Sequence, residues 1–203
     1  MKIKNKVDIN EIINTILNGE LVILKTDTIY GIIADATNKE SIQKVYEVKQ
    51  RSYDKPLIIL ISDLEMLNKY TRDINELEYY LIKKYWPGPL TMILKKSTLV
   101  NNMITSNLDT VGIRYPKDEN LLEIIRKLNR PIISTSANIS NEDNVININL
   151  IDESIKSKVK YIYDSGEINK VASTIIKVDN NKINILRNGC LEETIKNEFK
   201  NYI

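Results

Sequence analysis

The sequence predicts an α/β protein of one domain, in which helices flank a mixed sheet. Apolar residues at helical spacing alternate along the chain with short apolar runs that are typical of buried strands. Near the end, two strand-like runs are joined by Asp179-Asn180-Asn181, a turn that predicts antiparallel pairing. A length of 203 residues suits one domain with a sizeable core, and we expect that domain to span 1–203.

The first half of the chain alternates helices with strands. Apolar residues over 9–17 follow helical spacing, with Asp8 as the expected N-cap and Gly19 as the stop. The apolar run 21–24 is an expected buried strand, and the polar run 25–28 follows it. The other elements expected here are a helix over 38–50, a strand over 57–61 and a helix around 77–85 that ends at Trp86-Pro87-Gly88-Pro89.

The second half continues the alternation and ends in a hairpin. The expected elements are strands over 90–94 and 111–114, a helix over 120–128, a strand over 131–133, hairpin strands over 174–178 and 182–186, and a short helix from Leu191. The stretch 139–158 is polar and weakly patterned, so we expect a loop with room for one helical turn. In α/β sheets ligands bind beyond the carboxyl ends of strands. The polar segment 25–28, Arg114 and the segment 134–138 each stand where an expected strand ends.

Composition excludes several classes of site. The chain has no histidine and a single cysteine, Cys190, so it cannot hold a disulfide within itself, a His-containing or multi-Cys zinc site, or a Ser-His-Asp triad. Its net charge of +2 is far below that of a dedicated nucleic-acid binder and suits a small anionic ligand better. The glycine patterns of the P-loop and of the Rossmann turn are both missing. No apolar run has the length of a signal peptide core or a membrane span, which predicts a cytoplasmic protein.

Lys49, Arg51 and Lys55 gather where the helix expected over 38–50 ends. Cations at a helix C-terminus suit the helix dipole, so a solvated helix end is one interpretation. The other is a phosphate clamp, in which a planar Arg fork and two ammonium groups surround a polyphosphate. Spacing alone leaves both interpretations open.

Ser134-Thr135-Ser136-Ala137-Asn138 follows an expected buried strand. One interpretation is a strand-to-helix turn that is capped by Ser or Asn. The other is a phosphate site made of hydroxyls, an amide side chain and backbone N–H groups. Four hydrogen-bonding side chains in five residues exceed what one cap requires, and both interpretations stay open.

Three further candidates stand near the ends of other expected strands. The run 25–31 is either a turn in which Gly31 supplies an unusual backbone angle, or a small-ligand pocket with two threonine hydroxyls and Tyr30. Arg114 is either a surface residue or a bidentate clamp for a carboxylate, and Arg187 offers the same choice. No cluster of acidic residues offers a ready site for a divalent metal.

Eight short motifs occur in a fixed order between about 21 and 189. They are Thr26-Asp27-Thr28-Ile29-Tyr30-Gly31, Lys49-Gln50-Arg51, Lys55-Pro56-Leu57, Trp86-Pro87-Gly88-Pro89-Leu90-Thr91, Asp109-Thr110-Val111-Gly112-Ile113-Arg114, Ser134-Thr135-Ser136-Ala137-Asn138, Ser173-Thr174-Ile175 and Arg187-Asn188-Gly189. Each is modest by itself, but their shared order and spacing are specific. Through them the chain resembles the YrdC-type threonylcarbamoyl-AMP synthase family, in its short form without a further C-terminal domain.

The resemblance implies a twisted sheet of parallel and antiparallel strands, with flanking helices, around a concave cleft. It also implies a nucleotidyltransferase that makes L-threonylcarbamoyladenylate and pyrophosphate from L-threonine, bicarbonate (or CO₂) and ATP. The product would serve the threonylcarbamoyl modification of the tRNA adenosine next to the anticodon. The implied partners are a tRNA threonylcarbamoyl-transferase complex, which would receive the intermediate, and tRNA bound weakly. Mg²⁺ is the implied cofactor, held mainly through the ATP phosphates and by protein ligands that the sequence leaves unknown.

The resemblance also assigns roles to individual residues. Lys49 and Arg51 would be catalytic. The implied ATP-binding residues are Lys49, Arg51, Lys55, Thr110, Ser136, Asn138, Asn144 and Arg187. The implied threonine-binding residues are Thr28, Arg114, Ser134 and Ser173, with Arg114 pairing with the threonine carboxylate.

The sequence departs from the family pattern at two positions. Leu60 stands where members often carry His, and Lys25 replaces the usual Pro before Thr26.

Two alternative functions are open. One alternative is an RNA-binding or ribosome-maturation module that uses the same basic face. The modest charge and sparse aromatic residues, 6% of the chain, argue against stacking on RNA bases. The other is a carbamoyl-adenylate-forming enzyme with a different acceptor.

Overall fold

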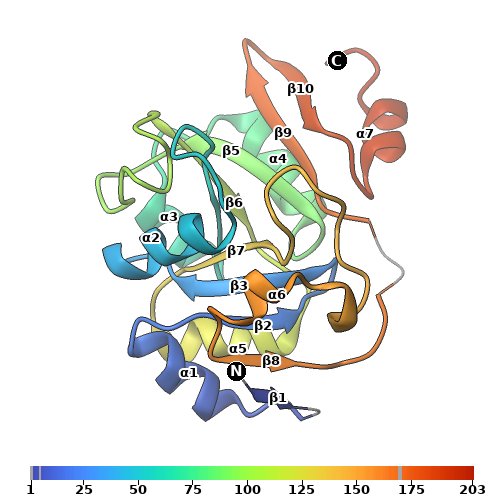
Figure 1. The fold of residues 1–203 in the computed structure, drawn as a ribbon. Coiled ribbons are helices and arrows are strands. Elements are labelled where there is room, and N and C mark those ends of the chain that lie inside the picture. The colour runs from blue at the N-terminus through green and yellow to red at the C-terminus, as the bar shows by residue number, and fades with distance from the viewer. Residues whose placement is uncertain (1, 5, 169–170) are drawn as a thin grey trace.

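One ten-stranded mixed sheet organises the chain. The computed structural model describes residues 2–4, 6–168 and 171–203. In chain order its strands are β1 (Lys2–Lys4), β2 (Val22–Lys25), β3 (Tyr30–Asp35), β4 (Ile58–Leu60), β5 (Leu90–Lys95), β6 (Thr110–Arg114), β7 (Ile132–Ser136), β8 (Tyr161–Tyr163), β9 (Thr174–Asp179) and β10 (Lys182–Arg187). Across the sheet the order is β1-β8-β2-β3-β7-β4-β6-β5-β9-β10. Figure 1 shows β2, β3 and β7 running across the view, β5 running obliquely, and β9 and β10 standing steeply, so the sheet is strongly twisted.

Parallel and antiparallel pairs are mixed along the sheet. The parallel pairs are β1 with β8, β8 with β2, β4 with β6, and β5 with β9. The antiparallel pairs are β2 with β3, β3 with β7, β7 with β4, β6 with β5, and β9 with β10. The mixed α/β class and the antiparallel pairing near the end are therefore confirmed.

Seven α-helices connect or flank the strands among the described residues. They are α1 (Ile9–Leu17), α2 (Lys39–Val48), α3 (Leu64–Tyr70), α4 (Glu76–Tyr85), α5 (Glu119–Leu128), α6 (Glu153–Lys156) and α7 (Glu192–Glu198), and a 3₁₀ turn spans Ile148–Leu150. The predicted N-cap Asp8 is confirmed, because its side chain accepts the backbone N–H of Glu11, and Asn38 caps α2 in the same way. At α4, Asn75 and Glu78 form a reciprocal capping box. No helix of the described residues is long and apolar enough to cross a membrane.

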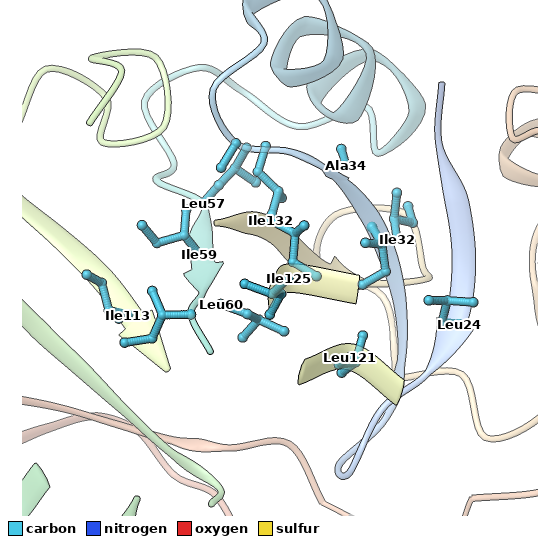
Figure 2. Packing of buried hydrophobic residues seen from close by; sticks show 14 of the residues in the cluster. Leu24, Ile32, Ala34, Leu57, Ile59, Leu60, Ile113, Leu121, Ile125 and Ile132 are labelled. Atoms are coloured by element: carbon cyan, nitrogen blue, oxygen red, sulfur yellow. The ribbon is translucent and has the colours of Figure 1, made fainter. Parts of the chain in front are cut away.

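The core lies between the central strands and the helices. Figure 2 shows Ile32 and Ile132 from neighbouring strands beside Leu121 and Ile125 of α5. All four are at most 1% exposed. The central strands are buried on both faces, because the cluster includes consecutive residues such as Ile32 and Ile33 of β3.

The structure adds four elements that the sequence does not indicate: β1, β3, α3 and β8. β1 and β8 have three residues each, too few to show an alternating pattern. β3 contains Gly31 and Ala34, which are poor strand formers, yet it is buried throughout between β2 and β7. The strand expected over 131–133 continues to Ser136, so the hydroxyl-rich segment is partly strand rather than turn.

Candidate active site

A cleft of about 300 Å³ lies over one face of the sheet. Pairs of residues two apart in four strands line it, as expected when alternate side chains of a strand face the same side. The pairs are Ile58 and Leu60 of β4, Thr91 and Ile93 of β5, Gly112 and Arg114 of β6, and Ser134 and Ser136 of β7. The site therefore lies on the sheet face as well as at strand ends, which corrects the expectation that it begins only where strands stop.

Seven of the twelve predicted site residues line this cleft. They are Thr28, Arg51, Arg114, Ser134, Ser136, Ser173 and Arg187. Their positions in the sequence span 160 residues, from 28 to 187, and only the pairing of distant strands brings them together. The set combines hydroxyls with guanidinium groups, which suits an anionic ligand.

Arg114, the last residue of β6, is held from the turn between β2 and β3. Its Nη1 donates to the Thr28 hydroxyl at 3.0 Å, and its Nη2 donates to the Asp27 carboxylate at 2.8 Å. The side chains of Arg114 and Asp27 are 5% and 9% exposed. The Arg114 Nε–H is buried without a hydrogen-bond partner among the described residues. An unsatisfied buried donor of a charged group is costly, so this nitrogen favours an incoming acceptor.

Arg187, at the end of β10, is tied to the residue before β9. Its Nε and Nη2 donate to the Ser173 carbonyl at 3.1 and 2.9 Å, and Nη2 also donates to the Ser173 hydroxyl at 2.9 Å. That hydroxyl lies 2.8 Å from the Thr91 hydroxyl, which is fully buried. Gly189 allows this arrangement, because a Cβ there would stand 2.5 Å from the Ala172 carbonyl oxygen.

Arg51 follows α2 and shapes the loop before β4. Its Nε donates to the Lys55 carbonyl at 3.0 Å and its Nη2 to the Pro56 carbonyl at 2.8 Å. Burial lowers the pKa of Arg51, Arg114 and Arg187 from the usual guanidinium value, and for Arg187 the charge of Arg114 lowers the pKa further. All three nevertheless stay protonated at neutral pH. Cations that repel one another in one cleft are stabilised by a bound anion.

Lys49 lies behind the cleft wall and does not line the cleft. The residue is 1% exposed, and its ammonium donates to the carbonyls of Ser136 and Asn138 at 2.6 and 2.7 Å. The Asn138 side-chain oxygen and the Ser136 hydroxyl lie at 3.2 and 3.4 Å. Burial lowers the Lys49 pKa to about 7, and the nearby Arg51 charge acts in the same direction. Lys49 and Asn138, which is itself 6% exposed, thus hold the end of β7 from behind.

The other three predicted residues also lie outside the cleft lining. Lys55 donates to the Asn141 side chain at 2.9 Å, and Asn144 is exposed. Thr110 begins β6 and shares the strand face of Gly112 and Arg114, so it lies on the same side of the sheet.

The pocket expected over 25–31 is confirmed for Thr26 and Thr28, which both line the cleft, whereas the roles of Gly31, Thr91 and Asp27 were not predicted. Gly31, expected at a turn, lies within β3, where a Cβ would meet the Ser134 hydroxyl at 2.9 Å. Tyr30, expected in a ligand pocket, donates instead to the Gly166 carbonyl at 2.7 Å. Thr91 lines the cleft and Asp27 holds Arg114. Both stand inside the motifs named above, and only their partners across the sheet reveal what they do.

The cleft does not fit a metal held by the protein alone. Its polar lining consists of hydroxyls, backbone groups and guanidinium groups, and no carboxylate is among the described residues that line it. Nor do the described residues contain a group of three or more His, Cys, Asp or Glu that could hold a metal ion. Divalent Mg²⁺ prefers carboxylate oxygens and phosphates, which three nearby guanidinium groups do not supply.

Comparison with known proteins places this geometry in a family. The Sua5/YciO/YrdC family profile, described as "Telomere recombination", matches residues 14–189. A protein of Methanocaldococcus jannaschii is 40% identical over 178 residues, which are 87% of this chain and 83% of that protein. A threonylcarbamoyl-AMP synthase of Pyrococcus abyssi is 38% identical over 177 residues, and the match spans 87% of this chain but 52% of the relative.

A solved structure agrees with the fold across the chain. The crystal structure of P. abyssi Sua5 complexed with L-threonine superimposes with a TM-score of 0.88 at 36% identity. The match covers 97% of this chain and 60% of that chain, so the present chain corresponds to somewhat over half of that relative. The profile match over most of the sequence, the relatives and the shared fold agree, and the chain belongs to the Sua5/YciO/YrdC family.

Proposed function

We propose that this protein is a threonylcarbamoyl-AMP synthase. It joins L-threonine, bicarbonate and ATP into L-threonylcarbamoyladenylate, with release of pyrophosphate and water. Relatives that carry this name are 34% and 38% identical to the chain. Because the chain spans about half the length of these two relatives, the activity rests as much on the cleft as on the similarity.

The proposal rests on the hydrogen bonds that the Arg114 guanidinium makes and on the one that it lacks. Asp27 and Thr28 hold its two terminal nitrogens, while its buried Nε–H lacks a partner among the described residues. A carboxylate is the acceptor that a guanidinium edge binds best. We assign the threonine carboxylate to Arg114, with Thr28, Ser134 and Ser173 as hydroxyl partners around the amino acid.

We assign the ATP phosphates to the other cations of the cleft. Arg51 and Arg187 supply positive charge there, and Ser136 supplies a hydroxyl. The proposed nucleotide site also includes four residues around the cleft: Lys55, Thr110, Asn138 and Asn144. Of these, Thr110 lies on the same face of β6 as Gly112 and Arg114. Lys49 contributes its charge from behind Ser136, since direct contact with a phosphate would break its bonds to Ser136 and Asn138.

The chemistry needs no histidine and no covalent enzyme intermediate. Bicarbonate takes up a proton and loses water to give CO₂. The unprotonated threonine amine adds to CO₂ and releases its proton to solvent, and an oxygen of the resulting carbamate attacks the α-phosphorus of ATP. The bond from that phosphorus to the bridging oxygen breaks, and pyrophosphate leaves with the electron pair. Preorganised cations around the departing pyrophosphate and the fixed placement of both substrates can then lower the barrier. Leu60 in the cleft is compatible with this scheme, because no general base from that strand is required.

Mg²⁺ enters this scheme with the substrate, bound to the ATP phosphates. The protein contributes hydroxyls and guanidinium groups around it, and no step is assigned to a metal held by the chain. We further propose that the product passes in the cytoplasm to a tRNA threonylcarbamoyl-transferase complex, and that contact with tRNA itself is weak.

Pyrophosphate release with substrates omitted one at a time tests the function. The purified protein, given Mg²⁺, should release pyrophosphate only when ATP, bicarbonate and L-threonine are all present. Equal release without threonine would sink the proposal. Release that depends on carbamoyl phosphate instead would indicate a different acceptor, and salt-sensitive RNA binding without release would indicate an RNA-binding module.

A further inference from the structure

Asp27 stands behind Arg114 as seen from the cleft, and its carboxylate is engaged at both oxygens. Oδ1 accepts from Arg114 Nη2 at 2.8 Å, and Oδ2 accepts the backbone N–H of Lys117 at 3.1 Å. The carboxylate therefore joins the turn between β2 and β3 to the loop between β6 and α5. Asp27 itself does not line the cleft, whereas Arg114 does.

Two nitrogens of the Arg114 guanidinium are held by hydrogen bonds, and the third has no partner among the described residues. Asp27 takes Nη2 and Thr28 takes Nη1, so the planar guanidinium cannot turn without losing both bonds. The third donor, the Nε–H, is buried and has no partner among the described residues. Left to itself, a guanidinium could swing any of its donors toward a ligand, and ordering it at the moment of binding would weaken affinity.

We infer that Asp27 is a positioning residue, which fixes the Arg114 guanidinium so that its Nε–H edge is kept for the carboxylate of the amino-acid substrate. The inference rests on the proposed function for the identity of that substrate. Asp27 does not line the cleft, so its effect on the substrate passes through Arg114. It also neutralises the buried guanidinium in the empty cleft, which makes a cation tolerable there before the ligand arrives.

The first test is a split between the two substrates. Asp27→Asn keeps the size of the side chain but leaves one acceptor oxygen for two donors, so either Arg114 or the Lys117 N–H loses its bond. We expect kcat/KM for threonine to fall about 30-fold, while KM for ATP stays within about twofold. Equal losses for both substrates, or no loss, would overturn the inference.

Two further variants separate positioning from general damage. Asp27→Glu keeps the charge and both acceptors but moves the carboxylate by one methylene, and kcat/KM for threonine should fall about 10-fold. Asp35→Asn is the matched control, because Asp35 is a buried carboxylate paired with Arg130 at 3.0 Å outside the cleft. It should leave KM for threonine unchanged within about twofold even where it lowers thermal stability.

A double-mutant cycle tests whether Asp27 acts through Arg114. In an Arg114→Ala background the guanidinium is gone, so adding Asp27→Asn should change kcat/KM for threonine by less than about twofold. A further loss as large as in the wild-type background would assign Asp27 a role of its own and overturn the inference.

The last arm does not depend on activity. The chain has six arginines, so the Nε–H signals of ¹⁵N-arginine-labelled protein can be resolved by NMR and the Arg114 signal assigned from Arg114→Lys. We expect that signal to exchange slowly with water in the wild type and at least about 10-fold faster in Asp27→Asn. An unchanged rate would overturn the inference. If the wild type releases no pyrophosphate with threonine, the proposed function fails while this arm still tests Asp27.

Discussion

The Lys49 ammonium donates a 2.7 Å hydrogen bond to the main-chain carbonyl of Asn138, which lies 89 residues further along the chain. This bond and its partner to the Ser136 carbonyl connect the C-cap of α2 to the end of β7. The cation that begins the phosphate motif in the sequence is thus occupied with shaping the wall on which Ser136 stands.

Lys49→Met keeps most of the buried stem but removes every donor from this wall. The carbonyls of Ser136 and Asn138 lose their partner, and the Ser136 hydroxyl is no longer held at its place in the cleft. We expect kcat/KM for ATP to fall about 100-fold, the scale of losing one preorganised donor worth roughly 3 kcal/mol. Lys44→Met on the same helix is the control, because its ammonium is bonded to Gly19 and Glu20 away from the cleft. Similar losses in both variants would contradict the role of Lys49.

The lowered Lys49 pKa predicts a pH dependence of stability. In the folded protein the pKa is about 7, whereas an unfolded lysine titrates near 10.5. Between pH 7 and 10.5 the unfolded chain binds more protons than the folded one, so the free energy of unfolding rises with pH. The cost of burying Lys49 is therefore smallest at high pH. Relative to Lys49→Met, the wild-type free energy of unfolding should rise by up to about 1.4 kcal/mol per pH unit from pH 7 toward 10. Urea unfolding of both proteins across this range measures it, and a flat difference would argue that Lys49 stays charged when folded.

The sequence predicts most helices and the central strands because their patterns are local. The cap Asp8 could be predicted because its side chain bonds to Glu11, only three residues further along the chain. β3 could not be predicted from the sequence. It is buried on both faces and contains Gly31, so it is stabilised by pairing with β2 and β7 rather than by the strand propensity of its own residues.

The site, like the fold, has residues that the sequence predicts and residues whose roles depend on strand pairing. The motifs identify Arg114, Arg51 and Ser136, because their residue types suit anions wherever they stand. They do not indicate that Lys49 is buried behind Ser136 or that Asp27 holds Arg114. Both facts depend on which distant backbone group each charge meets, and that is set by strand pairing.

Arg51→Ala and Arg114→Ala should damage different substrates. Arg51 stands by the loop before β4 and is assigned to phosphate, whereas Arg114 is assigned to the threonine carboxylate. We expect KM for ATP to rise at least about 10-fold in Arg51→Ala, and KM for threonine to rise by a similar factor in Arg114→Ala, each with the other KM nearly unchanged. Steady-state pyrophosphate release with one substrate varied at a time gives the four values. Identical profiles in the two variants would count against this division of the cleft.

Gly189→Ala should destabilise the protein by backbone collision. A Cβ at Gly189 would stand 2.5 Å from both the Ala172 carbonyl oxygen and the Thr174 nitrogen, and neither backbone atom can move aside alone. Thr174 begins β9, and Ser173 lies between Ala172 and Thr174. Arg187 donates to the carbonyl and the hydroxyl of Ser173, so an added Cβ must move the start of β9 and the cleft wall together. We expect a loss of at least about 2 kcal/mol in the free energy of unfolding, together with a higher KM for threonine.

Gly112→Ala is the matched control for this collision. The nearest atom to a Cβ at Gly112 is a side-chain carbon of Ile58, at 3.2 Å, which can give way by a small rotation. Its loss in urea unfolding should stay below about 1 kcal/mol. Equal losses of stability in the two variants would contradict the prediction. The backbone from Ala172 to Thr174 would then move as easily as one isoleucine side chain, and the absence of a Cβ at Gly189 would not be required for the contact between Ser173 and Arg187.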